Sequence, residues 1–248
     1  MENLKEALQY LVNLGEETAR PEVLEICGKT YANKNLVRYG GKEYARAMEV
    51  SSLTAVLDYI AAAGAEFRQD MILHVQSPKR VSLVSFLDDE DRCRECLLTA
   101  KANVSEFGFD QWYDQERFIM ELQANFLANE DLEKLQAVAG NVEGGTTANY
   151  GDDGVSQKTT IKSGITTRED VVVPNPATLI PWRTFPEIEQ PESKFVFRIR
   201  DNRDGAPEFK LLEADGGIWK NEAIENIKEY LRNGLDSIDC PVNIHVIG

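Results

Sequence analysis

Apolar residues recur along this chain with two spacings, one typical of helices and one typical of strands. Leu4, Leu8, Leu11 and Leu14 lie on one face of a helix predicted over residues 3–14, and Gly15 is expected to end it. The same spacing predicts further helices from Ser51 or Ser52 to Ala63, over residues 115–128, after a cap at Asn129, and over residues 221–234.

Strand signals are strongest in the second half of the chain. In KFVFRIR, residues 194–200, Phe195, Phe197 and Ile199 alternate with more polar neighbours. Other strands are predicted at residues 71–75, 81–86, 154–164, 170–173, 208–214 and 241–247. These elements predict an α+β fold, with a mostly antiparallel sheet, helices packed on one side and a C-terminal β-β-α-β unit.

Residues 140–154 contain five glycines and almost no apolar residue, which is typical of a loop. We expect a domain boundary here. It would separate an N-terminal region of helices and hairpins, 1–145, from a C-terminal α+β region, 146–248; one continuous domain is the alternative.

Five of the nine prolines fall within residues 174–191. Proline cannot donate a backbone hydrogen bond, so this stretch is expected to form a sheet edge or an extended surface path. Its large apolar residues must then be covered by the chain itself or by a partner subunit. The candidate subunit interface of a homo-oligomer is therefore Leu179, Ile180, Trp182 and Phe185.

The formal net charge of −15 opposes nucleic-acid binding unless basic residues are concentrated locally. They are concentrated in residues 28–48, which carry five basic residues against one acid, Glu43. Basic groups mixed with tyrosines could bind a single-stranded backbone and its bases, although a hairpin that offsets an acidic surface explains them too. The nucleic-acid-binding candidates are Lys29, Tyr31, Lys34, Arg38, Tyr39, Lys42, Tyr44 and Arg46.

Catalytic signatures for phosphate binding, nucleotide binding, serine hydrolysis and zinc hydrolysis are absent from the sequence, which has two histidines. Two acidic sets could serve a metal-dependent nuclease or nucleotide hydrolase, although turn residues explain both equally well. They are Asp152 and Asp153 with Lys158, and Glu213 and Asp215 with Lys220.

Cys93 and Cys96 form a single C-x-x-C pair, and zinc would require two further ligands. We expect reduced thiols, no metal site and no cofactor. No apolar run approaches the length of a membrane helix, and the N-terminus does not resemble a signal peptide. A cytoplasmic location is therefore expected, with no membrane partner.

The segments GDDGVSQ, VPNPATLIPWRTFPEIEQPESKFVFRIR and LLEADGGIWKNEAI resemble the YfdQ-like family, an uncharacterised family of phage and prophage proteins. The resemblance extends from about residue 50 and is strongest over residues 150–230. It carries no established activity and no residue roles. It implies a phage protein in the cytoplasm of a bacterial host, in DNA replication, recombination or counter-defence.

Three hypotheses follow. The leading one is a non-enzymatic phage accessory protein that binds a host or phage protein, or nucleic acid. The second is a self-assembling homo-oligomeric structural protein. The third is the metal-dependent nuclease or nucleotide hydrolase.

Overall fold

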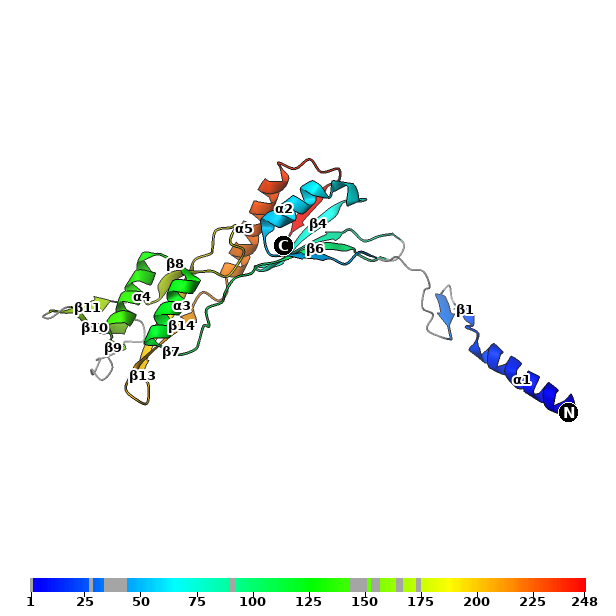
Figure 1. Cartoon of the computed structure of the whole chain (residues 1–248), viewed down its shortest axis with the longest axis horizontal. Helices are drawn as coiled ribbons and strands as arrows, with labels where there is room; N and C mark the ends of the chain where they lie inside the picture. The colour runs from blue at the N-terminus through cyan, green and yellow to red at the C-terminus, as the bar shows by residue number, and fades with distance from the viewer. Residues whose placement is uncertain are drawn as a thin grey trace. The chain divides into compact units, whose positions relative to one another are not determined.

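The computed structural model divides into two units, Met1–Tyr44 (unit 1) and Ala45–Gly248 (unit 2). It describes residues 2–26, 29–33, 44–89, 92–142, 151–152, 157–163, 167–172 and 175–248 (Figure 1), with the backbone alone for residues 2, 29–30, 151–152, 157–163 and 167–172.

Unit 1 consists of one helix and one hairpin. Its elements are α1 (Glu2–Ala19), β1 (Val23–Ile26) and β2 (Lys29–Ala32), and the two strands pair antiparallel. The expected end of the helix at Gly15 is wrong. Glycine costs an interior helix position only about 1 kcal/mol, and Glu16 and Glu17 continue the helix. Pro21 ends it instead, because a residue that precedes proline disfavours the helical conformation.

The first sheet of unit 2 has five strands in the order β15-β4-β5-β6-β3. The inner strands pair antiparallel, whereas the outer strands β3 and β15 pair parallel to β6 and β4. The strands are β3 (Met48–Val50), β4 (Met71–Ser77), β5 (Arg80–Ser85), β6 (Cys96–Lys101) and β15 (Ile244–Ile247).

Two helices, α2 (Leu53–Ala62) and α5 (Trp219–Leu235), cover one face of this sheet (Figure 1). As expected, a serine caps α2, because Ser52 Oγ accepts from Ala55 N at 3.2 Å. The short 3-10 helix η1 (Gly64–Glu66) follows. Leu53, Val56 and Ile60 pack on alternate residues of the strands to form the first core.

The second five-stranded sheet is antiparallel, in the order β7-β14-β13-β12-β8. The strands are β7 (Tyr113–Asp114), β8 (Phe126–Leu127), β12 (Ala177–Pro181), β13 (Ser193–Asp201) and β14 (Pro207–Glu213). The predicted alternation in β13 is confirmed: Phe195, Phe197 and Ile199 are buried and the side chains between them are more exposed.

The helices α3 (Gln115–Asn125) and α4 (Glu130–Asn141) lie side by side against the second sheet (Figure 1). Asn129 caps α4 as expected, because its Oδ1 accepts from Leu132 N at 2.8 Å. The core between these helices and the second sheet is rich in aromatic side chains. Phe118 of α3 stacks on Phe209 and Phe197, with ring centroids 5.2 and 5.9 Å apart.

A third, three-stranded sheet has the order β11-β10-β9, and α4 contacts β10. Its strands are β9 (Gly151–Asp152), β10 (Gln157–Ser163) and β11 (Thr167–Val172). The strands pair antiparallel.

In the sequence, the elements of the second sheet and its helices lie between strands β6 and β15 of the first sheet. The chain leaves the first sheet after β6, builds every element from β7 to β14, and returns through α5 and β15. Strands from both sides of residue 145 therefore pair in both five-stranded sheets. The expected regions 1–145 and 146–248 are not separate units; the chain divides after Tyr44 instead.

The proline-rich stretch is not a sheet edge, because β12 pairs with β13 on one side and β8 on the other. The loop after it joins the two cores: Leu179 belongs to the second core, whereas Phe185 and Ile188 belong to the first. Glu187 Oε1 also accepts from Leu53 N at 2.7 Å at the start of α2.

The α+β class with mostly antiparallel strands is confirmed, and so is the placement of helices on one side of each five-stranded sheet. The order β13, β14, α5, β15 also matches the expected β-β-α-β sequence. These elements do not form one unit, however, since β15 pairs with β4 in the other sheet.

Candidate functional site

A buried arginine lies at the centre of the most extensive polar cluster in unit 2. Arg183, in the loop between β12 and β13, is 5 % exposed. Its Nη1 donates to Glu213 Oε1 at 3.0 Å, and its Nη2 donates to Pro191 O at 3.3 Å and to Ser193 Oγ. The guanidinium carbon lies 4.0 Å from the ring centre of Trp219. The Nε of Arg183 and the indole Nε1 of Trp219 are buried without a hydrogen-bond partner.

A second carboxylate completes this cluster. Asp215 Oδ2 accepts from Ser193 Oγ, and its Oδ1 accepts from Gly217 N at 3.0 Å. Burial alone would raise the pKa of Asp215, but these two hydrogen bonds and the charge of Arg183 outweigh it and hold the pKa below its usual range. Asp215 is therefore ionised at neutral pH.

Burial has the opposite effect on the cation. It lowers the pKa of Arg183 to about 10, although Glu213 and Asp215 both oppose that shift. Arg183 still carries its charge at neutral pH. The two carboxylates therefore compensate a buried positive charge, which would destabilise the fold if it stood alone.

The structure brings together the second of the two acidic sets expected from the sequence. Glu213 and Asp215 both belong to the Arg183 cluster, but no ion pair among the described residues joins Lys220 to either of them. Glu213 Oε1 and both oxygens of Asp215 accept from protein donors, which gives these carboxylates a structural role. Sequence reasoning missed Arg183, although a single arginine within the apolar run LIPWRTF is the signal that could have found it.

The first acidic set is only partly described. Asp152 ends β9 and pairs in register with Gln157 of β10, next to Lys158. Asp153 lies outside the described residues. Among the described residues, no group of three histidines, cysteines or acids could hold a metal ion.

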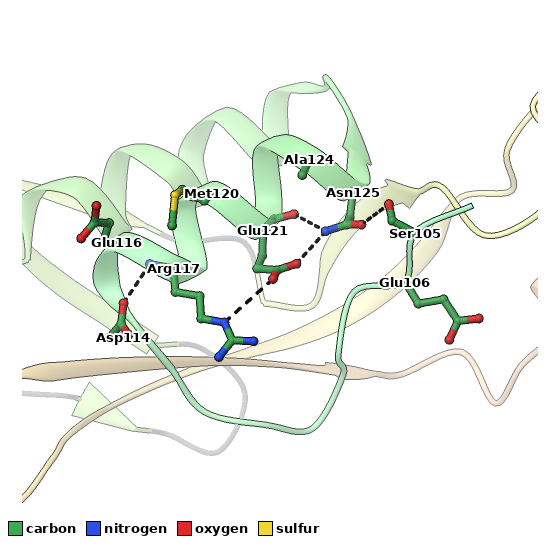
Figure 2. A pocket seen from close by; sticks show the side chains of 9 residues that line it. All are labelled: Ser105, Glu106, Asp114, Glu116, Arg117, Met120, Glu121, Ala124 and Asn125. Carbon is green, nitrogen blue, oxygen red and sulfur yellow. Dashed lines mark hydrogen bonds and ion pairs between the residues drawn. The ribbon is translucent and has the colours of Figure 1, made fainter. Parts of the chain in front are cut away.

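Two surface hollows lie in unit 2, one beside the Arg183 cluster and one beside α3. One, of about 510 Å³, borders the Arg183 cluster at Asp215, Trp219 and Glu222. The other, of about 700 Å³, lies along the outer face of α3, and Figure 2 shows its lining.

Three side chains that line the α3 hollow, Arg117, Glu121 and Asn125, interact along one face of the helix (Figure 2). The buried Asn125 donates through Nδ2 to Glu121 Oε2 at 2.8 Å, and its Oδ1 accepts from Ser105 Oγ at 2.7 Å. Arg117 Nε lies 3.9 Å from Glu121 Oε1. The contact with Ser105 fixes the end of α3 to the preceding segment, and the others lie within the helix, so these groups serve the fold.

The basic and aromatic candidates for nucleic-acid binding are described in part. Lys29 and Tyr31 lie in β2, and Tyr31, Tyr44 and Arg46 are exposed. The other candidates, Lys34, Arg38, Tyr39 and Lys42, lie outside the described residues.

The candidate interface in the proline-rich stretch needs correction. The chain itself covers Leu179 and Phe185, which are both 0 % exposed, whereas Ile180 and Trp182 are half-buried. The expectation of an exposed apolar path failed because alternate residues of β12 point into the second core and the loop after it enters the first. Leu179 and Phe185 are not available to a partner subunit.

Most of the exposed large apolar side chains among the described residues lie in unit 1. Every side chain described there is exposed, including the predicted stripe of α1. Leu4, Leu8, Leu11 and Leu14 are 67 %, 55 %, 61 % and 46 % exposed. Sequence reasoning found this stripe but not its exposure, because periodicity shows that a helix is amphipathic without showing what covers it.

Three cysteines lie in the described ranges: Cys93 is exposed, and Cys96 and Cys240 are half-buried. None of the helices within the described ranges has the length and apolar character needed to cross a membrane.

Comparison of the chain with protein-family models, with curated proteins and with solved structures finds no match.

Proposed function

We propose that this chain is a non-enzymatic accessory protein that acts by binding other protein chains through unit 1. The observation that carries this proposal is the uncovered leucine stripe of α1. A helix of 18 residues and a two-stranded hairpin are each marginal in water unless an apolar surface covers them. Unit 2, in contrast, contains both large cores of the molecule.

The chemistry of unit 2 supports binding over hydrolysis. Glu213 binds Arg183 directly and Asp215 binds it through Ser193, and three of the four carboxylate oxygens accept hydrogen bonds from protein donors. The phage or prophage setting, and with it a part in DNA metabolism or counter-defence, rests on the resemblance of residues 150–230 to the YfdQ-like family. A cytoplasmic location belongs to the same proposal.

Photo-crosslinking from the stripe tests this proposal. The photoreactive residue p-benzoylphenylalanine is placed at Val12 in one variant and at Met120 in another. These side chains are 54 % and 53 % exposed, so they form a matched pair on α1 and α3. After irradiation in bacterial cells, we expect covalent adducts with a protein from position 12 and none from position 120. The proposal falls if position 12 yields no adduct or if both positions crosslink alike.

A further inference from the structure

We infer that the partner of α1 is the α1 helix of a second copy of this chain, so that the protein assembles through a bundle of its own N-terminal helices. This inference rests on the proposed function, since it names the occupant of the same stripe. It follows from the spacing of the leucines, from the placement of the charges and from the hairpin next to α1.

The leucines follow the repeat by which helices pack on one another. Leu8 lies four residues after Leu4 and three before Leu11, and Gly15 and Thr18 continue that alternation with smaller residues. A repeat of 3.5 residues keeps one seam facing a partner helix along its whole length. Leu8 and Gly15 then occupy position a of the heptad, and Leu4 and Leu11 occupy position d.

The residues beside the seam are mostly small or apolar. In this register Val12 lies at position e, and Ala7 and Leu14 lie at position g. These residues widen the apolar surface beyond a narrow seam, which is typical of a helix covered by other helices on more than one side. The exposure of Val12 and Leu14 shows that the described residues of unit 1 leave this wider surface uncovered.

The charges identify the partner as another copy. The acids Glu6, Glu16 and Glu17 fall at positions f, b and c, which point away from the seam. Lys5, at position e, is the one charged residue of α1 beside the seam, so identical helices can pack without placing their acids in contact. A basic partner attracted by the net charge of −15 would contact this acidic face and would leave the leucines uncovered.

The hairpin extends the same surface. Val23, Leu24, Ile26 and Tyr31 are at least half exposed, on a sheet of two strands. Copies joined through α1 bring their hairpins close together, because only three residues separate α1 from β1. The apolar area of one copy is then available to cover that of the next.

The molar mass of the full chain in solution, measured by light scattering at tens of micromolar, tests the inference. We expect at least twice the chain mass of 27.9 kDa. The double variant Leu8→Glu/Leu11→Glu should reduce the mass to that of one chain. The matched control Gln9→Glu/Asn13→Glu adds the same charge at positions b and f and should leave the assembly intact. Tryptophan fluorescence, which reports unit 2 because Trp112, Trp182 and Trp219 all lie there, should be unchanged in every variant.

Several outcomes would overturn the inference. One is a wild-type chain of 27.9 kDa, and another is an assembly that survives Leu8→Glu/Leu11→Glu. A third is loss of assembly in the control variant as well, which would show a general effect of added charge.

The crosslinks from position 12 separate this inference from the proposed function. Adducts of twice the chain mass support both proposals. Adducts with a different protein overturn the second copy as partner but leave binding through unit 1 in place. If position 12 gives no adduct, both proposals fall.

Discussion

Units 1 and 2 have similar kinds of apolar sequence but place it differently. In unit 2, Phe118, Phe197 and Phe209 stack in a core closed to water. In unit 1, the leucines of α1 are regularly spaced and exposed. Burial of a leucine contributes about 1.5–3 kcal/mol, so the same residue type stabilises unit 2 directly and can stabilise unit 1 only where a surface outside unit 1 covers it. Unit 2 therefore has apolar cores of its own, whereas unit 1 leaves the apolar face of α1 uncovered.

The largest loss of stability is expected from truncating a side chain in the core of unit 2. Phe118→Ala should lower the free energy of unfolding by about 3–5 kcal/mol, because it removes a fully buried ring and leaves a cavity. Urea unfolding followed by tryptophan fluorescence measures this change. In the same assay Leu11→Ala should cost unit 2 less than about 0.5 kcal/mol. Equal losses in the two variants would break the comparison.

The next largest loss of stability is expected from removing the buried charge of Arg183. Arg183→Met should destabilise unit 2 by about 3 kcal/mol, because it keeps an apolar stem beside Trp219 but leaves Glu213 and Asp215 without their cation. The control Lys134→Ala removes an exposed ion pair with Glu130, 2.6 Å long, and should cost far less, because water screens the pair. A cost for Arg183→Met no larger than the control would remove the structural role assigned to the cluster.

A helix cap that makes two contacts should matter more than one that makes a single contact. Asn129 accepts from Leu132 N and also donates to Thr178 O at 2.8 Å, so Asn129→Ala should cost about 2 kcal/mol. Ser52→Ala removes a cap alone and should cost about 1 kcal/mol. Thermal unfolding of the two variants side by side ranks them. The reverse order would contradict the contact with β12.

The lowered pKa of Asp215 should make the free energy of unfolding depend on pH in the acid range. Because the pKa of Asp215 is lower in the folded state, its stabilisation is present above the ordinary pKa of about 4 and is lost as the pH falls through the lowered value. We expect the free energy of unfolding to fall more steeply below about pH 5 in the wild type than in Asp215→Asn. Parallel curves for the two proteins would speak against this shift.

The smallest change in stability is expected in helix α1 of unit 1. A Cβ added at Gly15 would meet no atom within 4 Å, so Gly15→Ala should favour the helix by about 0.5–1 kcal/mol. Far-ultraviolet circular dichroism of the variant should show more helix, with no change in the unfolding of unit 2. A loss of helix would mean that Gly15 has a conformational role.

The sequence predicts local structure in this chain well. The caps at Ser52 and Asn129 and the alternation in β13 depend on neighbouring residues, so they could be read directly. The course of the chain depends on distant contacts and could not. Nothing near residue 244 indicates that β15 pairs with β4, and nothing near Phe185 indicates that the chain passes from one core to the other.

The candidate site was predictable only in fragments. Glu213 and Asp215 were found as acids near a turn, but their partner Arg183 is 30 residues from Glu213 and belongs to another loop. The stripe of α1 was found from its period. Its exposure was not, because a period identifies an apolar face whether the same chain or another one covers it.

The pairing of β15 with β4 has a consequence for synthesis on the ribosome. Asp70 accepts from the backbone N of Asn243, 173 residues further along the chain, so this edge of the first sheet stays open until that segment has been made. At about 5–20 residues per second the delay lasts roughly 10–30 s. The inserted block from β7 to β14 is completed during that interval, so the nascent chain can form its second core before its first is closed.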